Sequence, residues 1–275
     1  MNLHIAVIGS NGMLGRDVCK ELNQRNISFT AFTKDILDIT SIEDVGTHIT
    51  SSYTHVINCA AYTNVDEAES NHELCDSLNI TGVKNLTDRC KKLGVTLLSM
   101  STDYVFDGKK ESYTEDSTRD PINYYGLSKA KGEEYIESQL SKYFIIRTAW
   151  LFGINGKNFV DTMITLGTDK DEITVVSDQI GSPTYTQDLA KSVISLLYSN
   201  KYGIYHLTNS GSCSWMEFAI EIMKQQHLDC KVLSCTSSEF ERDAKRPAYS
   251  ILRNTKTALL PSWKNALKRY LEERT

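Results

Sequence analysis

The sequence has few features that interrupt a chain or link it covalently. Only four of its 275 residues are proline, and no low-complexity linker or internal repeat divides it. Its seven cysteines, at positions 19, 59, 75, 90, 213, 230 and 235, form no CxxC pair and no metal-type spacing with histidine. We therefore expect reduced thiols, no metal site, and either one large domain or two closely joined ones.

Hydrophobic patterning and charge exclude several classes of partner. No apolar stretch is long enough to cross a membrane, and residues 1–12 lack the basic flank and small-residue cleavage site of a signal peptide. The net charge of -5 at pH 7 gives an acidic field that does not attract nucleic acids or membrane surfaces. The sequence thus predicts a cytoplasmic protein with a small-molecule ligand, no nucleic-acid partner and no membrane partner.

Short apolar segments alternate with helical patterns along the first half of the chain. The expected strands are residues 3–9, 27–32, 54–60, 95–101 and 143–150. Such alternation predicts an α/β fold with a Rossmann-type, doubly wound parallel sheet, in which ligands bind beyond the carboxyl ends of the strands. After residue 150 the units are shorter and mixed α/β, which predicts a smaller domain whose segments interleave with the first.

A glycine-rich turn follows the first expected strand and opens the first helix. In the segment GSNGMLG, Gly9 permits a tight turn, Gly12 lets the backbone approach a pyrophosphate, and Gly15 allows close helix packing. A βα turn without a ligand can carry the same glycines, so the strand-turn-helix context gives the motif its weight. It predicts an NAD(P)-binding domain in residues 1–149 and a mainly substrate-binding domain in residues 150–275.

The end of the second expected strand bears on the choice of dinucleotide. An acidic residue there would bind the 2′-hydroxyl of an NAD ribose, whereas this sequence has Thr33 and Lys34. A hydroxyl and a cation suit a 2′-phosphate and favour NADPH, although the neighbouring Asp35 keeps NADH open. Asp38 and Ile39 are expected to flank the adenine.

A tyrosine and a lysine four residues apart open a long helical segment. Tyr125 and Lys129 share one helix face, which Tyr124 does not. A nearby cation and the positive charge of an oxidised nicotinamide would lower the pKa of Tyr125 and suit it to donate a proton to a carbonyl. Thr102, at the carboxyl end of the fourth strand, would donate a second hydrogen bond to the same oxygen.

Further motifs follow in order over nearly the whole chain. Besides GSNGMLG and YGLSK they are LDIT, NCAAYTNVDEAE, STDYVFDG, RTAWLFG, NFV, DQIGSPTYTQDLA, SWMEFA and RPAYS. Through these motifs the sequence resembles the extended short-chain dehydrogenase/reductases, and most closely the dTDP-4-dehydrorhamnose reductase family. NCAAYTNVDEAE together with STDYVFDG is the strongest part of the resemblance.

The resemblance implies roles for particular residues. Thr102, Tyr125 and Lys129 would be catalytic, and Lys129 would also hold the nicotinamide ribose. The implied cofactor-binding residues are Gly9, Asn11, Gly12, Met13, Leu14, Gly15, Thr33, Lys34, Asp38, Ile39, Ala60, Ala61, Tyr62, Thr63, Asn79, Tyr125 and Lys129. The implied substrate-binding residues are Thr102, Asp103, Val105, Trp150 and Arg246, with the Arg246 guanidinium facing a diphosphate.

The resemblance also implies an activity. It is NADPH-dependent reduction of the 4-keto group of dTDP-4-dehydro-L-rhamnose, which supplies a precursor of cell-surface polysaccharide. Related 4,6-dehydratases carry Thr-Asp-Glu at this strand end, and Tyr104 in the third place favours a reductase. Two alternatives stay open: a reductase or epimerase of another nucleotide-linked 4-keto sugar, and a non-catalytic NADP-binding regulatory subunit. A homodimer is one expectation for the oligomeric state, which the sequence leaves open.

Several other residues are expected to be structural. The acidic residues within 66–69 are typical of a solvated helix face, and His206 of a buried histidine with satisfied hydrogen bonds. Trp150 is compatible with a core position as well as with a substrate contact, and Trp215 with the core or a helix start. Asp17 lies where some relatives bind a metal, but a helix N-terminus already explains an acid there.

Overall fold

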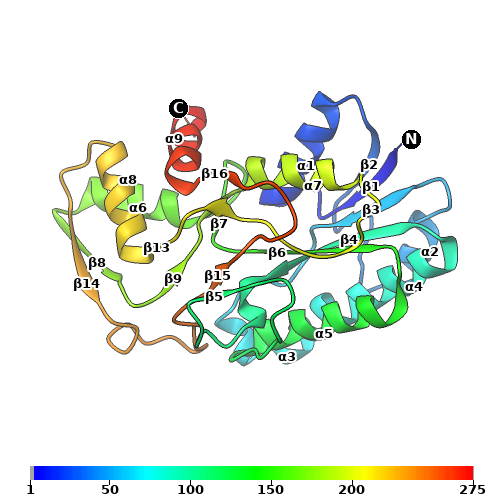
Figure 1. The fold of residues 1–275 in the computed structure, drawn as a ribbon, viewed down its shortest axis with the longest axis horizontal. Coiled ribbons are helices and arrows are strands. Elements are labelled where there is room, and N and C mark those ends of the chain that lie inside the picture. The colour runs from blue at the N-terminus through cyan, green and yellow to red at the C-terminus, as the bar shows by residue number, and fades with distance from the viewer. Residues whose placement is uncertain (1–2, 275) are drawn as a thin grey trace.

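The computed structural model describes residues 3–274 and contains a six-stranded parallel sheet with helices on both faces (Figure 1). The strand order is β11-β6-β4-β3-β1-β2, and all neighbours are parallel. This confirms the expected Rossmann-type sheet. The strands are β1 (His4–Ile8), β2 (Ser28–Phe32), β3 (His55–Asn58), β4 (Thr96–Thr102), β6 (Tyr143–Thr148) and β11 (Gly203–His206).

Helices cover the two faces of the sheet in separate layers (Figure 1). One layer contains α1 (Met13–Gln24) and α7 (Thr186–Leu196); the other contains α4 (Val83–Leu93) and α5 (Tyr124–Gln139). Successive residues of a strand point to opposite faces, so the apolar runs of the sequence supply both cores. Val7, Leu98 and Ile146 pack in the core under α1 and α7, whereas Ala6, Leu97 and Ile145 pack in the core under α4 and α5.

Short helical segments complete the first half. The loop after β3 contains a 3₁₀ turn, Glu67–Glu69, and leads into α3 (His72–Asp76), the π-helical turn Ser77–Gly82 and α4, which together form one nearly continuous helical stretch. A second 3₁₀ turn, Asp103–Val105, follows β4 directly. This half also contains α2 (Ile42–His48).

The second half forms a smaller group at one end of the sheet, on the left of Figure 1. Its own core contains Phe152, Phe218, Trp263 and Tyr270. Its helices are α6 (Phe159–Asp169), α8 (Trp215–Gln225) and α9 (Trp263–Arg274). Its paired strands are β8 (Glu172–Val176) with β14 (Lys231–Cys235), β7 (Leu151–Phe152) with β10 (Thr184–Tyr185), β9 (Ile180–Gly181) with β13 (Cys213–Ser214), β12 (Asn209–Ser210) with β16 (Leu260–Ser262), and β15 (Ile251–Leu252) with β5 (Ser112–Tyr113) of the first half.

Parts of the second half belong physically to the main sheet. β11 forms its edge beside β6, and α7 packs on α1. The boundary expected at residues 149/150 stays a prediction. Within residues 3–274, no helix combines the length and apolar character needed to cross a membrane.

A buried ion-pair network fixes α5 to the sheet. The Glu133 carboxylate, 2% exposed, accepts hydrogen bonds from Arg147 Nη2 at 2.6 Å, Arg119 Nη1 at 2.8 Å and Ser101 Oγ at 2.5 Å. Arg147 also lies 3.4 Å from His206 Nε2. Burial and the Arg147 charge lower the pKa of His206 to about 4, so this residue is a neutral structural histidine, as expected.

Replacing Glu133 with alanine should destabilise the protein strongly. The change leaves Arg147 buried without its carboxylate, a defect that lowers the free energy of unfolding by about 3–5 kcal/mol. Urea denaturation followed by circular dichroism measures this loss. Glu134→Ala, at the exposed neighbouring position, is the control and should change stability by about 0.5 kcal/mol or less. A loss below about 1 kcal/mol for Glu133→Ala would contradict the structural role of the network.

Candidate active site

The turn between β1 and α1 has no room for side chains at two of its glycines, Gly9 and Gly15. Gly9 has a φ of 70°, in the left-handed region that favours glycine, and its carbonyl accepts from Gly12 N at 3.0 Å. A Cβ on Gly9 would lie 2.8 Å from Ala60 N, and a Cβ on Gly15 would lie 2.2 Å from Gly9 O. The turn therefore keeps its backbone open at the start of α1, where the helix N-terminus favours an anion such as a pyrophosphate.

A cavity of about 240 Å³ lies beside this turn, at the carboxyl ends of β1, β2 and β3. Its apolar walls suit an adenine ring, and the exposed ammonium of Lys34 suits a ribose phosphate. The residues present therefore fit a dinucleotide. The lining residues that the sequence predicted are Gly9, Asn11, Gly12, Lys34, Asp38, Ile39, Ala60 and Ala61; those that it missed are Ile8, Leu37, Cys59 and Leu78.

The other expected cofactor residues of the first half do not line this cavity. Asn79 is buried in the π-helical turn and supports the loop after β3: its Oδ1 accepts from Tyr62 N at 3.0 Å, and its Nδ2 donates to Tyr62 O at 3.1 Å. Asn79 Nδ2 also donates to Ser128 Oγ at 3.0 Å, which ties this loop to α5. Tyr62, Leu14 and Gly15 are buried, Met13 and Thr33 are partly exposed, and Thr63 is exposed.

The first turn of α5 lies against the end of β4. Thr102 Oγ1 accepts from Tyr104 N at 3.2 Å and donates to Asp103 Oδ1 at 2.9 Å, which fixes the turn that follows the strand. A Cβ on Gly126 would lie 2.1 Å from Tyr104 O. Because Gly126 has no side chain, the helix can approach the strand end closely enough for Tyr125 to reach Thr102.

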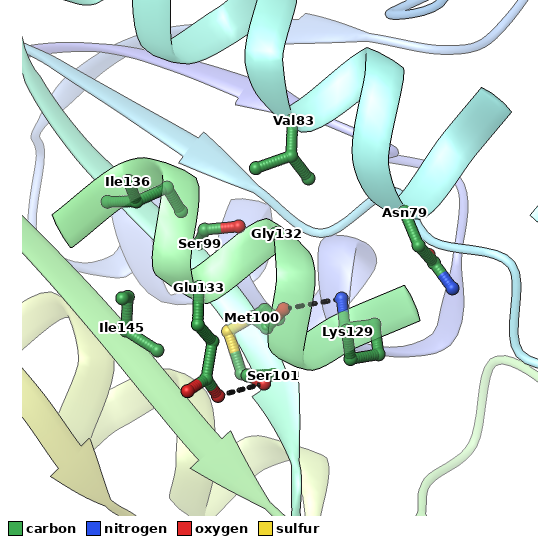
Figure 2. Close-up of a pocket in the computed structure, with 10 residues that line it drawn as sticks. All are labelled: Asn79, Val83, Ser99, Met100, Ser101, Lys129, Gly132, Glu133, Ile136 and Ile145. Carbon is green, nitrogen blue, oxygen red and sulfur yellow. Dashed lines mark hydrogen bonds between the residues drawn. The ribbon is translucent and has the colours of Figure 1, made fainter. Parts of the chain in front are cut away.

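The structure brings Thr102 and Tyr125 together, but it corrects the expected electrostatics. Burial raises the pKa of Tyr125, and contact with the Thr102 hydroxyl offsets only part of this rise. Lys129 Nζ donates instead to Met100 O at 2.7 Å (Figure 2), and burial lowers the pKa of Lys129 to about 8. The expected lowering of the Tyr125 pKa by Lys129 is not found, because loss of hydration is the largest influence on this group; the lowering expected from an oxidised nicotinamide stays a prediction. Tyr125 is thus protonated at neutral pH.

A cavity of about 10 Å³ separates α5 from β4 beneath Lys129 (Figure 2). Its volume is at the lower limit for one water molecule. Polar groups of Asn79, Ser99 and Ser101 line it, together with Lys129 and Glu133. Lys129 and Glu133 are one helical turn apart, and the carboxylate raises the pKa of the lysine against the larger effect of burial. The buried network therefore helps to keep Lys129 charged.

Trp150 occupies a constrained position at the end of β6. Its φ of 48° is in the left-handed region, and its indole stacks on Trp215 with ring centroids 3.5 Å apart. Gly181 leaves space for this ring, since a Cβ there would lie 2.5 Å from Trp150 Cε2. Trp150 is partly exposed, whereas Val105, another expected substrate residue, has its side chain fully buried in the core. Of the two side chains, only that of Trp150 has surface available to a substrate.

Arg246 forms an ion pair that the sequence did not indicate. Arg246 Nη1 and Nη2 donate to Asp66 Oδ1 and Oδ2 at 2.5 and 2.8 Å. Asp66 also accepts from Arg242 Nη1 and from Ala244 N, both at 3.2 Å. The assignment of Asp66 to a solvated acidic face is therefore wrong, because its carboxylate holds a loop of the second half.

Glu69, from the same acidic segment, supports α5. Its Oε1 accepts from Tyr124 N at 2.7 Å, at the first residue of the helix. The Tyr124 hydroxyl donates to Asp76 Oδ2 at 3.0 Å, and its ring stacks on His72 with centroids 3.6 Å apart. Tyr124 is thus directed to α3 and is structural, in contrast to Tyr125.

Asp17 is engaged within the fold. Its Oδ2 accepts from Thr186 Oγ1 at 2.5 Å, which joins α1 to α7. Over residues 3–274, no group of three or more His, Cys, Asp or Glu side chains is arranged to hold a metal ion.

The parallel sheet, the glycine turn with its cavity, and the meeting of Thr102 and Tyr125 beside Lys129 define a protein of the short-chain dehydrogenase/reductase class. Comparison with known families is more specific. The RmlD substrate binding domain family matches residues 3–275, and the chain belongs to this family. It is 41% identical over 278 residues to the spore coat polysaccharide biosynthesis protein SpsK of Bacillus subtilis (strain 168), with 98% of each chain covered.

Two solved structures are similar over the whole chain. A dTDP-4-dehydrorhamnose reductase from Clostridium acetobutylicum has a TM-score of 0.95 and 42% identity, covering 98% of this chain and 99% of that one. A dTDP-4-dehydrorhamnose reductase from Bacillus anthracis, crystallised in complex with NADP, has a TM-score of 0.94 and 40% identity, covering 99% and 100%. The resemblance stated from the motifs is confirmed.

Asp103 should make the stability of the protein depend on pH. Burial raises the pKa of Asp103 from 3.8 to about 6, so the folded protein binds this proton more tightly than the unfolded chain does. The favourable contribution of Asp103 to the free energy of unfolding is therefore complete below about pH 4 and is lost as pH rises through about 6. Asp103→Asn should gain about 1–3 kcal/mol relative to the parent between pH 4.5 and 7.5, measured by urea denaturation.

The control for this prediction is Asp116→Asn, where the side chain is 88% exposed. Its stability difference from the parent should change much less over the same pH range. A pH-independent difference for Asp103→Asn would contradict the effect of burial on Asp103.

Proposed function

We propose that this protein uses NADPH to reduce the 4-keto group of dTDP-4-dehydro-L-rhamnose, giving dTDP-L-rhamnose for cell-surface polysaccharide. The observation that carries the proposal is the meeting of the Thr102 and Tyr125 hydroxyls at a strand end, with Lys129 on the same helix face. Two similar structures, at 40% and 42% identity, bear the name dTDP-4-dehydrorhamnose reductase, and one was crystallised with NADP. Tyr104, in place of the glutamate of the dehydratases, supports reduction without loss of water.

The cofactor and the residues of the site have separate roles in carbonyl reduction. NADPH, when bound, supplies the hydride that adds to the carbonyl carbon. Tyr125 would donate a hydrogen bond to the carbonyl oxygen, and Thr102 would donate a second one after its hydroxyl turns away from Asp103 Oδ1, so that negative charge developing there is stabilised. Tyr125 would then transfer its proton to this oxygen and complete the hydroxyl group. Burial favours this role, because it keeps the phenol protonated at neutral pH until the substrate needs the proton.

The charged and aromatic residues would bind and orient the two ligands. The Lys129 ammonium would hold the nicotinamide ribose and stabilise the phenolate left on Tyr125 after proton transfer. Trp150, already held by its stack on Trp215, would pack on the sugar. Arg246 would bind the diphosphate, for which a planar guanidinium has matching geometry.

We also infer a cytoplasmic location. All seven cysteines are free thiols, as expected in a reducing compartment. The homodimer stays a prediction.

Tyr125→Phe should abolish most turnover and leave cofactor binding intact. The change removes the proton donor while keeping the ring, so turnover should fall by about 10²–10⁴-fold. The NADPH dissociation constant, measured by fluorescence titration, should stay within about twofold. Tyr124→Phe is the matched control: it loses only the hydrogen bond to Asp76 and should retain turnover within about fivefold. Turnover of Tyr125→Phe within about tenfold of the parent would exclude Tyr125 as the proton donor.

The cofactor preference should favour NADPH. Lys34 lines the dinucleotide cavity and is exposed, so its ammonium is available to a 2′-phosphate. The ratio of kcat/KM for NADPH to that for NADH should exceed about ten in the parent and fall about tenfold or more in Lys34→Glu. Steady-state rates at 340 nm measure both ratios. A preference for NADH in the parent would overturn the role of Thr33 and Lys34.

Substrate panels separate the two alternatives. Faster turnover of another nucleotide-linked 4-keto sugar would identify that sugar as the substrate of the same reduction. No turnover of any keto sugar, together with co-purification of a partner enzyme, would indicate a regulatory subunit.

A further inference from the structure

Asp66 joins two segments that are distant in the sequence. It lies in the loop after β3, and its partners Arg242, Ala244 and Arg246 lie in a loop of the second half. The Asp66 side chain is 30% exposed and that of Arg246 is 12% exposed, so solvent screens the pair only in part. Asp66 thus helps to fix the position of this loop, together with Asn123 at the start of α5, whose Nδ2 donates to Lys245 O at 2.8 Å.

The pairing leaves part of the Arg246 guanidinium available. Both Nη1 hydrogens are engaged, one by Asp66 Oδ1 at 2.5 Å and one by Ala244 O at 2.6 Å. Asp66 Oδ2 accepts a hydrogen bond from Nη2 at 2.8 Å, which engages one of the two Nη2 hydrogens. The other Nη2 hydrogen and the Nε hydrogen form the second edge of the planar group, which the Tyr104 hydroxyl contacts and which has the fork geometry that matches a phosphate.

This guanidinium lies next to the reaction site and to a large cavity. It contacts the Tyr104 hydroxyl, and the Tyr104 ring packs edge-on against Tyr125 with centroids 5.8 Å apart. Arg242, Lys245 and Arg246 line a cavity of about 780 Å³, a volume in the range of small-molecule sites. Glu241 and Asp243 line the same cavity, so with Asp66 three carboxylates balance these three cations, and an anion would be bound by the donors of Arg246 and not by a net positive charge.

We propose that Asp66 is a positioning residue that holds Arg246 in the orientation that binds the diphosphate of the nucleotide-sugar substrate. The inference rests on the proposed function. Asp66 anchors one edge of the guanidinium and the backbone of its loop, and the diphosphate takes the other edge. Displacing Asp66 would break its hydrogen bonds to Arg242, Ala244 and Arg246 together. The diphosphate therefore binds Arg246 while the ion pair between Asp66 and Arg246 stays intact.

Removal of the Asp66 charge tests this arrangement. If Asp66 positions Arg246, diphosphate binding becomes weaker, whereas if Asp66 competes with the diphosphate, binding becomes tighter. Asp66→Asn keeps the size of the side chain but loses the bidentate ion pair, which frees Arg246 to move. In the presence of saturating NADP, the dissociation constant of dTDP, measured by calorimetry, should rise about tenfold. The KM of the keto-sugar should rise similarly, whereas kcat and NADP affinity should stay within about threefold. Asp66→Glu should restore part of the lost affinity.

A double-mutant cycle separates positioning from a purely structural role. Arg246→Met alone should weaken dTDP binding, and adding Asp66→Asn should weaken it little further, because Asp66 acts through Arg246. Additive losses would indicate that Asp66 acts on the fold in general. Asp116→Asn is the matched control and should leave dTDP binding unchanged.

Two other results would overturn the proposal. Tighter dTDP binding by Asp66→Asn would show that Asp66 competes with the diphosphate. Unchanged binding would show that Asp66 does not position Arg246. In both cases, turnover of the keto-sugar by the parent protein would leave the proposed function intact. Failure of the parent to bind dTDP or to turn over the keto-sugar would remove the proposed function together with this role.

Discussion

The first turn of α5 touches the backbone at the end of β4, and the active site depends on this contact. Gly126 permits it, since a Cβ there would lie 2.1 Å from Tyr104 O. Asn123 caps the helix by accepting from Gly126 N at 2.8 Å, and Glu69 accepts from Tyr124 N. One helical turn beyond Lys129, the buried Glu133 carboxylate holds the same helix to β4 by a hydrogen bond from Ser101 and to β6 by an ion pair with Arg147. The helix is thus held at its first turn and again at Glu133, and this places Tyr125 against Thr102.

Burial is the main influence on the charges of the site. It raises the pKa of Tyr125 and of Asp103 and lowers the pKa of Lys129, in each case favouring the neutral form. A protonated phenol beside a threonine hydroxyl is suited to stabilise and then protonate an alkoxide. Glu133 acts in the opposite direction on Lys129 and preserves its charge.

Local patterns predicted the sheet and much of the site, because strands, glycine turns and helix faces are encoded by neighbouring residues. Five strands of the sheet, β1, β2, β3, β4 and β6, and the GSNGMLG turn are of this kind. α9 was not among the expected elements, although its buried residues Trp263, Ala266, Leu267, Tyr270 and Leu271 follow a helical period. The pairing of Asp66 with Arg246 could not be read from sequence, because it depends on the folding of the second half against the first. The same holds for the raised pKa of Tyr125, which results from burial by distant segments.

Transfer of deuterium from NADPH labelled at C4 of the nicotinamide tests the central claim most directly. With dTDP-4-dehydro-L-rhamnose as substrate, the account predicts stoichiometric oxidation of NADPH and a product, dTDP-L-rhamnose, that carries one deuterium at C4 of the sugar. Mass spectrometry and proton NMR of the isolated product identify the position of the label. NADPH oxidation without deuterium at C4, or no reaction with this substrate at all, would contradict the account.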